Sequence, residues 1–204
     1  MKERKSLRLK IWFVALLSIL VVFGGLSLLV IQQKLRLRGL ESSIAALKEE
    51  YIPLRFQVMA RSGGGIETKM KFFDAEGKLI SVAEHSMKGE SFFLDFVSVP
   101  VGKSHLAFPK AAFTEAIPAE LGASLFSYYD KDGFPEIFAA QGLDQRTRDS
   151  LTALFFKLKL GQQPGSSFGN AVHDIKEFKT FELGTVYKVV TRQKGGIEIV
   201  EDDE

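Results

Sequence analysis

An uninterrupted apolar run near the N-terminus is the strongest pattern in the chain. Residues 11–31 contain no charged side chain and nothing more polar than Ser18 and Ser27. At 1.5 Å per residue, a helix of this length spans about 30 Å, the thickness of a bilayer's hydrocarbon core. Soluble helices this long normally have a polar face, so the run predicts a transmembrane helix and not a buried core helix.

The flanks of this run favour an uncleaved signal anchor. The apolar region of a cleaved signal peptide has about 7–15 residues and ends at a small-residue cleavage site. Here the run is longer and is followed by Gln32, Gln33 and Lys34. We therefore predict a single-pass signal anchor over residues 11–31, with a cleaved signal peptide as the alternative. The five basic residues before the run are Lys2, Arg4, Lys5, Arg8 and Lys10.

The same basic residues predict the orientation of the span. Five positive charges precede it, and three follow closely at Lys34, Arg36 and Arg38. Because positive flanks stay in the cytoplasm, residues 1–10 should form a basic cytoplasmic tail. The rest of the chain would then be exported from the inner (plasma) membrane, and its C-terminal domain would be periplasmic or otherwise extracytoplasmic.

Residues 32–52 are predicted to form a juxtamembrane amphipathic helix. Its apolar positions step by three and four residues, the spacing of a coiled coil, over about two heptads. Pro53 ends the helix, because the residue before a proline avoids the α region. Two interpretations remain open: a seam that pairs two copies, or a linker that packs on its own domain. The possible homodimer seam consists of Leu37, Leu40, Ile44 and Leu47, followed by Tyr51.

Residues 53–204 are predicted to form a mainly β domain of the α+β class. After Pro53 the apolar period changes from 3.6 to 2, which is the period of a strand with one polar face. Four or five strands at short intervals indicate an antiparallel meander, in a sandwich or an open barrel. The expected strands cover residues 54–61, 66–72, 78–85, 91–101 and 103–108, with turns at Ser62–Gly65, Asp74–Gly77 and Ser86–Glu90.

The second half of this domain is less regular. Prolines interrupt residues 109–142, where only Ala111–Ala116 is expected to make a helical turn or two. Asp144 is placed to cap a helix near residues 145–160, whose apolar positions fall at i, i+3, i+4 and i+7. We expect a closing hairpin from residues 181–191 and 197–200, and a solvated acidic tail over residues 201–204. The apolar positions of the helix are Leu151, Leu154, Phe155 and Leu158, and Gly161 follows them.

Composition and charge then narrow the function classes. The chain of 204 residues is 46% hydrophobic and has no Cys, which excludes a disordered protein, a disulfide framework and thiol catalysis. Residues 1–50 hold 9 Lys and Arg against 4 Asp and Glu, whereas residues 51–204 hold 18 against 21. The basic excess therefore lies beside the membrane segment, and we predict no nucleic-acid partner.

No run of residues indicates catalysis, a cofactor or a metal centre. His85, His105 and His173 are far apart and lack a metal-ligand spacing. Asp130 and Asp132 resemble the start of a calcium loop, but Phe134, Pro135 and Gln141 stand where that loop needs an oxygen donor, a glycine and a glutamate. We interpret the run as a tight turn and assign no catalytic, cofactor-binding or metal-binding residue.

The sequence thus indicates a bitopic cell-envelope protein that binds or scaffolds other envelope proteins and is not an enzyme. Its partners would be the lipid bilayer and unidentified envelope proteins. In organisation alone, the layout resembles bacterial division and envelope-scaffold proteins. The alternatives are a membrane-anchored exported hydrolase and a sensor domain that binds a small ligand. A hydrolase should show a deep cavity with convergent titratable groups, and a scaffold an apolar patch or an open strand edge.

The predicted topology has a direct test. Because the positive bias places the N-terminus in the cytoplasm, protease added outside spheroplasts should degrade the C-terminal domain. Lysed spheroplasts serve as the control for protease activity. A domain that resists digestion until lysis would reverse the assignment.

Overall fold

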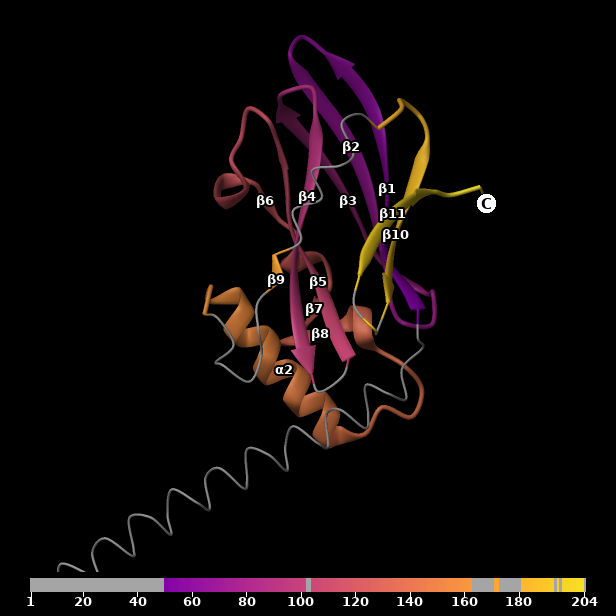
Figure 1. The fold of residues 1–204 in the computed structure, drawn as a ribbon, viewed down its shortest axis with the longest axis vertical. Coiled ribbons are helices and arrows are strands. Elements are labelled where there is room, and N and C mark those ends of the chain that lie inside the picture. The colour runs from indigo at the N-terminus through magenta and orange to yellow at the C-terminus, as the bar shows by residue number, and fades with distance from the viewer. Residues whose placement is uncertain are drawn as a thin grey trace, which may run out of the picture. The chain divides into compact units, whose positions relative to one another are not determined.

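The computed structural model describes residues 50–101, 104–162, 171–172, 181–192, 194 and 196–203 (Figure 1). All of them belong to a compact unit, Gly39–Glu204. The predicted tail, membrane span and most of the juxtamembrane helix lie outside the described residues. Among the residues that are described, no helix combines the length and the apolar character needed to cross a membrane.

A five-stranded antiparallel sheet forms one layer of the domain. Its strand order is β11-β10-β1-β2-β3, so β1 is central and the C-terminal hairpin completes the side opposite β3. Inward apolar and outward polar positions alternate along β1 and β2, as a half-buried sheet requires. The strands are β1 (Glu50–Ser62), β2 (Gly65–Phe73), β3 (Leu79–Lys88), β10 (Val186–Arg192) and β11 (Ile197–Glu201).

A four-stranded sheet forms the second layer, with the order β6-β5-β4-β9. The long β4–β5 hairpin makes up most of it, and the apolar β4 is an interior strand, as its sequence predicts. The domain is therefore mainly β with antiparallel sheets, which confirms that part of the predicted fold. The strands are β4 (Phe92–Val101), β5 (Ser104–Thr114), β6 (Ala123–Ser124) and β9 (Ala171–Val172).

The inner faces of the two sheets share one hydrophobic core. The Phe56 ring of β1 lies 5.3 Å from the Phe92 ring of β4, measured between centroids. The buried Tyr51 hydroxyl of β1 donates a hydrogen bond of 3.3 Å to the Ala107 carbonyl of β5. Burial raises the pKa of Tyr51 to about 12, so this donor stays protonated at physiological pH.

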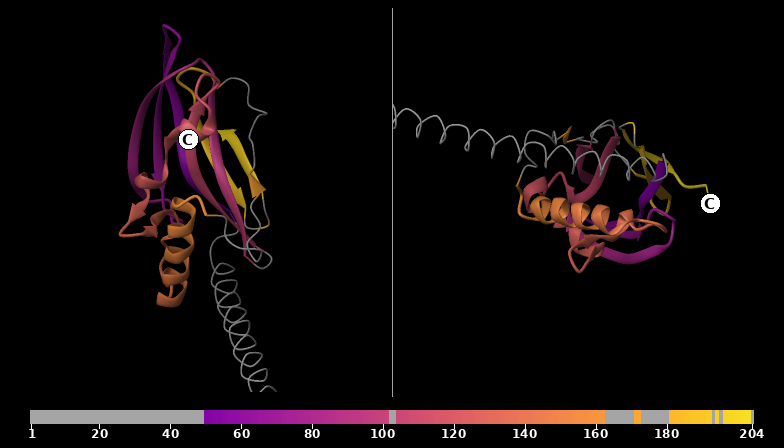
Figure 2. Two further views of the ribbon diagram at one scale, coloured as in Figure 1. Left: turned by 90° about the vertical axis from the view of Figure 1, so that its left-hand side faces the viewer. Right: turned by 90° about the horizontal axis from the view of Figure 1, so that it is seen from below.

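Helix α2 (Gln145–Lys159) lies at the lower end of the domain in Figure 1 and in the left view of Figure 2. The predicted cap is confirmed, because the Asp144 carboxylate accepts a 2.9 Å hydrogen bond from the Thr147 amide. The predicted apolar face is buried, and the Phe155 ring stacks on Phe108 of β5 at 6.0 Å. Before α2 come η1 (Ala119–Leu121), η2 (Phe126–Tyr128), β7 (Asp130–Lys131), β8 (Phe134–Pro135) and η3 (Glu136–Phe138).

The predicted end of the juxtamembrane helix is wrong. Residues 50–52 begin β1 and are not helical, so the β domain starts before residue 53. Tyr51 pairs with Thr191 of β10, and burial of its side chain outweighs the heptad pattern that it continues. Pro53 lies where the register of β1 with β10 shifts, a position where a strand tolerates the missing amide.

Two further expectations are corrected. Ala111–Thr114 belongs to β5 and not to a helical turn, because it pairs with β4 after a register shift near Lys110. The acidic tail is not fully solvated, since the Asp202 side chain is only 3% exposed. Asp202 forms ion pairs with Arg55 at 2.8 Å and with Lys188 at 3.0 Å.

The Asp202 ion pairs provide a stability test. Replacing Asp202→Asn should lower the free energy of unfolding by about 2 kcal/mol, because it leaves two partly buried cations without their counter-ion. Asp203→Asn is the matched control at an exposed neighbour and should change it by less than about 0.5 kcal/mol. Urea unfolding of the detergent-solubilised chain measures both. If both substitutions change the free energy of unfolding equally, the Asp202 ion pairs do not contribute to stability.

Candidate functional site

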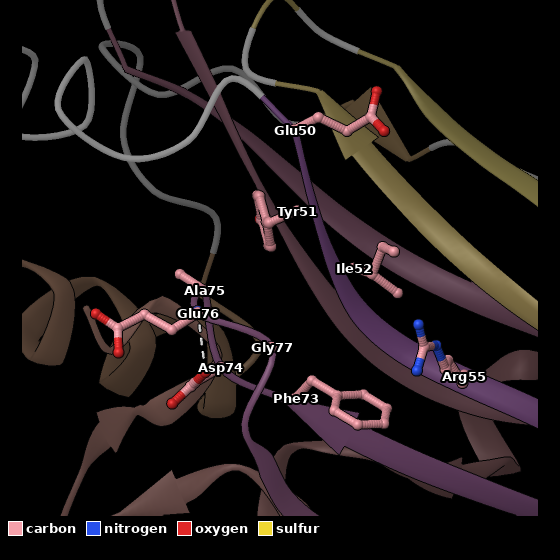
Figure 3. Close-up of a pocket in the computed structure, with 9 residues that line it drawn as sticks. All are labelled: Glu50, Tyr51, Ile52, Arg55, Phe73, Asp74, Ala75, Glu76 and Gly77. Carbon is pink, nitrogen blue, oxygen red and sulfur yellow. Dashed lines mark hydrogen bonds between the residues drawn. The ribbon is translucent and has the colours of Figure 1, made fainter. Parts of the chain in front are cut away.

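A shallow cavity lies where β1 begins, beside the turn between β2 and β3 (Figure 3). Its volume is about 180 Å³, below the roughly 300–1,000 Å³ of typical ligand pockets. We call it the β2–β3 turn cavity. It is lined by Glu50, Tyr51, Ile52, Arg55, Phe73, Asp74, Ala75, Glu76 and Gly77.

The turn itself is built by one carboxylate. Asp74 Oδ1 accepts hydrogen bonds from the amides of Glu76 at 2.9 Å and Lys78 at 2.8 Å. Gly77 has a φ of +85°, which a residue with a side chain rarely adopts, and its amide donates to the Asp74 carbonyl. The sequence Asp-Ala-Glu-Gly therefore folds as the predicted turn, with the Asp74 side chain occupied by backbone donors.

The other charged groups around the cavity are also paired. The Arg55 guanidinium contacts Asp202 and lies over the Phe73 ring, 5.1 Å from its centroid. Glu50 contacts Arg192 at 3.1 Å, and Glu76 Oε1 accepts a 2.6 Å hydrogen bond from the Gln141 amide. These contacts stabilise the end of the domain where β1 begins, and they leave no cluster of convergent acids and bases among the lining residues.

The histidines singled out in the sequence are not brought together. His85 is on β3 and His105 is on β5, in different sheets, and His173 lies outside the described residues. Within the described ranges, no group of three or more His, Asp or Glu side chains is arranged to hold a metal ion.

Asp130 and Asp132 belong to a tight hairpin between β7 and β8, as the sequence predicts. Asp132 and Gly133 occupy the two turn positions with φ of 54° and 88°, the signature of a two-residue hairpin loop. Asp130 Oδ1 accepts a 2.8 Å hydrogen bond from the Gly133 amide, and its Oδ2 pairs with Lys159 of α2. The Asp130 carboxylate thus fixes α2 to the hairpin.

The edge of β3 is a surface that the sequence pattern did not identify. β3 is the last strand of the five-stranded sheet, so alternate residues direct backbone groups away from β2. Its Lys88 carbonyl accepts a hydrogen bond from the Thr114 hydroxyl. In the part of the chain that the structure describes, no backbone hydrogen bond links β3 to any strand except β2.

Exposed apolar side chains lie along this edge of β3. Leu79 is 49% exposed and Val82 is 43% exposed, and Ile80 between them is half-buried. Both edge strands have exposed charged residues, Glu198 and Glu201 on β11 and Glu84 and Lys88 on β3. Of these two strands, only β3 also has large exposed apolar side chains. We refer to residues 79–88 and their outward side chains as the β3 edge.

A short helical turn supports the inner side of β3. The Tyr128 ring of η2 stacks on Phe72 at 5.5 Å and meets the His85 ring edge-on at 5.6 Å, and the Ser81 hydroxyl donates to the Tyr128 carbonyl. Burial lowers the pKa of His85, because a charged imidazolium there loses hydration. His85 Nε2 is buried without a hydrogen-bond partner among the described residues.

Comparison with known proteins yields no relative for this chain. No family model, curated protein or solved structure matches it.

The lowered pKa of His85 predicts a pH dependence of stability. Below the ordinary histidine pKa of about 6.5, His85 binds a proton in the unfolded chain but remains neutral in the folded chain. The free energy of unfolding should therefore fall as the pH decreases from about 6.5. The slope should be a fraction of about 1.4 kcal/mol per pH unit, since the ring is partly exposed. Thermal melts between pH 5 and 8 measure it. His85→Gln should reduce the dependence of the melting temperature on pH over this range. An unchanged pH dependence would contradict the attribution to His85.

Proposed function

We propose that this chain is a single-pass envelope protein whose exported β domain binds a partner envelope protein. The observation that carries the proposal is the β3 edge, where exposed apolar side chains lie along a strand whose backbone pairs with no other described strand than β2. An extended segment of a partner can add to such an edge as a further strand. Backbone hydrogen bonds then supply affinity, and contacts with alternate side chains supply specificity.

The outward face of the sheet suits an amphipathic strand. Val82 lies opposite Lys71 in the register of β2 and β3, and Glu84 lies opposite Lys69, with which it forms an ion pair of 2.8 Å. A partner strand beside β3 would meet an apolar position near Val82 and a charged position near Glu84. We therefore expect its outward side chains to alternate between apolar and basic residues, since opposite charges on neighbouring strands stabilise pairing.

The two alternatives receive less support from the described residues. A hydrolase or a small-ligand sensor needs a concave site with polar groups that converge on the ligand. The β2–β3 turn cavity is small, and the carboxylates of Asp74 and Glu76 already accept backbone hydrogen bonds. The β3 edge requires no such cavity, which is why strand addition is the better proposal.

Site-specific cross-linking in membranes tests this function. A photoreactive amino acid at Val82 should form an adduct with one defined partner, because that side chain is beside the added strand. The matched control is the same amino acid at Leu121, which is exposed on η1 and not on β3. Leu79→Lys should reduce the adduct at position 82 at least fivefold, because a lysine at an edge strand discourages pairing.

The outcomes separate clearly. A single adduct at position 82 that is absent at position 121 and weakened by Leu79→Lys supports strand addition. The same adducts at both positions, or an adduct unaffected by Leu79→Lys, would remove the β3 edge as the binding surface.

A further inference from the structure

Helix α2 presents a second apolar face that no described residue covers. Phe156 is 57% exposed and Leu160, the residue that caps the C-terminus of α2, is 55% exposed. The exposed Ala153 lies on the same face, one turn before Phe156. These residues lie opposite the buried positions of α2, so the core does not account for them. Large aromatic and aliphatic side chains exposed together on one face usually mark a contact surface.

The charges around this face are mostly positive. Gln145–Lys159 contains four basic residues and one acidic residue, whereas residues 51–204 as a whole hold 18 basic against 21 acidic residues. The acidic residue, Asp149, is exposed on the same face and accepts a hydrogen bond of 2.7 Å from the Gln145 side-chain amide. Lys159 pairs with Asp130, and Arg148 lies over the Phe134 ring at 4.3 Å. Arg146 and Lys157 are exposed, and no ion pair joins either of them to another described residue. The exposed apolar side chains are thus flanked by cations that can bind external anions.

The chain length allows this face to reach a membrane. Eighteen residues separate Ile31, at the end of the predicted span, from Glu50, where β1 begins. Even as the predicted helix, at 1.5 Å per residue, these residues would span about 27 Å. Both the start of β1 and α2 lie in the lower half of the domain in Figure 1. A domain tethered in this way meets the bilayer at high effective concentration, so a weak contact suffices.

We propose that the exposed face of α2, formed by Arg146, Ala153, Phe156, Lys157 and Leu160, lies on an anionic lipid surface. Phe156 and Leu160 enter the boundary between headgroups and acyl chains, and Arg146 and Lys157 contact lipid phosphates, as in interfacial amphipathic helices. The exposed basic residues beside the two large apolar side chains favour an anionic lipid surface as the occupant, because lipid phosphates attract exposed cations. The inference rests on the proposed membrane anchoring and adds the orientation of the domain on the bilayer.

The absence of Cys makes a direct experiment possible, because one introduced cysteine is the only thiol to label. The full chain with Ala153→Cys is labelled with a fluorophore and reconstituted in nanodiscs that contain phosphatidylglycerol and headgroup-level spin-labelled lipids. The matched control is Ser86→Cys, exposed on β3. We expect quenching at position 153 to exceed that at position 86 at least threefold, and to fall at least twofold in discs of phosphatidylcholine alone.

A second variant tests the apolar contact. In the Ala153→Cys chain, Phe156→Ser with Leu160→Ser should reduce quenching to the level of the Ser86→Cys control. Leu121→Ser, a comparable change at an exposed apolar residue of η1, should leave it unchanged. Because all three side chains are exposed, a thermal melt should show that each variant remains folded.

The possible failures are distinguishable. A chain that does not co-purify with nanodiscs contradicts the membrane anchoring and hence the proposed function. A chain that co-purifies but shows equal quenching at positions 153 and 86 overturns the α2 contact alone. Equal quenching at position 153 in anionic and zwitterionic discs also overturns it, because the proposal requires anionic headgroups.

Discussion

The packing of aromatic rings between the two sheets is the constraint on which the rest of the domain depends. Phe56 lies 4.8 Å from Phe181 and 5.6 Å from Tyr187, and 5.3 Å from Phe92 of the second sheet. Facing sheets are about 10 Å apart, and rings fill that space where small side chains would leave voids. These rings come from β1, β4 and the C-terminal part of the chain, so one cluster fixes the sheets relative to each other and decides which faces point outward.

Sequence patterns predict the elements that are stabilised by interactions between residues close together in the chain. The alternation in β1 and β2, the Asp144 cap and the turn at Asp132 and Gly133 each depend on residues within a few positions. The end of the juxtamembrane helix and the second half of β5 were mispredicted because pairing with distant strands overrides heptad spacing and alanine's preference for helix. The β3 edge was also missed, since strand order is a property of the whole sheet. Likewise, Asp202 is a buried ion-pair partner only because the fold brings Arg55 beside it.

The β3 edge and the exposed face of α2 share no residue and belong to different elements. The proposed partner binding and the proposed lipid contact should therefore be separable by mutation. The positions of the β3 edge and of α2 nevertheless depend on the same hydrophobic core. Phe155 of α2 packs on Phe108 of β5, and Tyr128 of η2 packs on Phe72 behind β3. The β2–β3 turn cavity has a structural role in this arrangement. Its Arg55 and Glu50 join the first strand to Asp202 and Arg192, and its Glu76 joins the β2–β3 turn to the loop before α2.

The pairing of β1 with β10 has a consequence for the order in which the domain can fold. The Thr191 hydroxyl donates to the Tyr51 carbonyl across 140 residues of sequence, so β1 completes its hydrogen bonds only after nearly the whole chain is available. During synthesis β1 is made early, and its β10-facing side stays open until β10 follows. Such long-range pairing folds slowly and leaves an aggregation-prone edge. A chain truncated before its last hairpin would keep this side of β1 open, and its β1 edge would then be available for pairing with other chains.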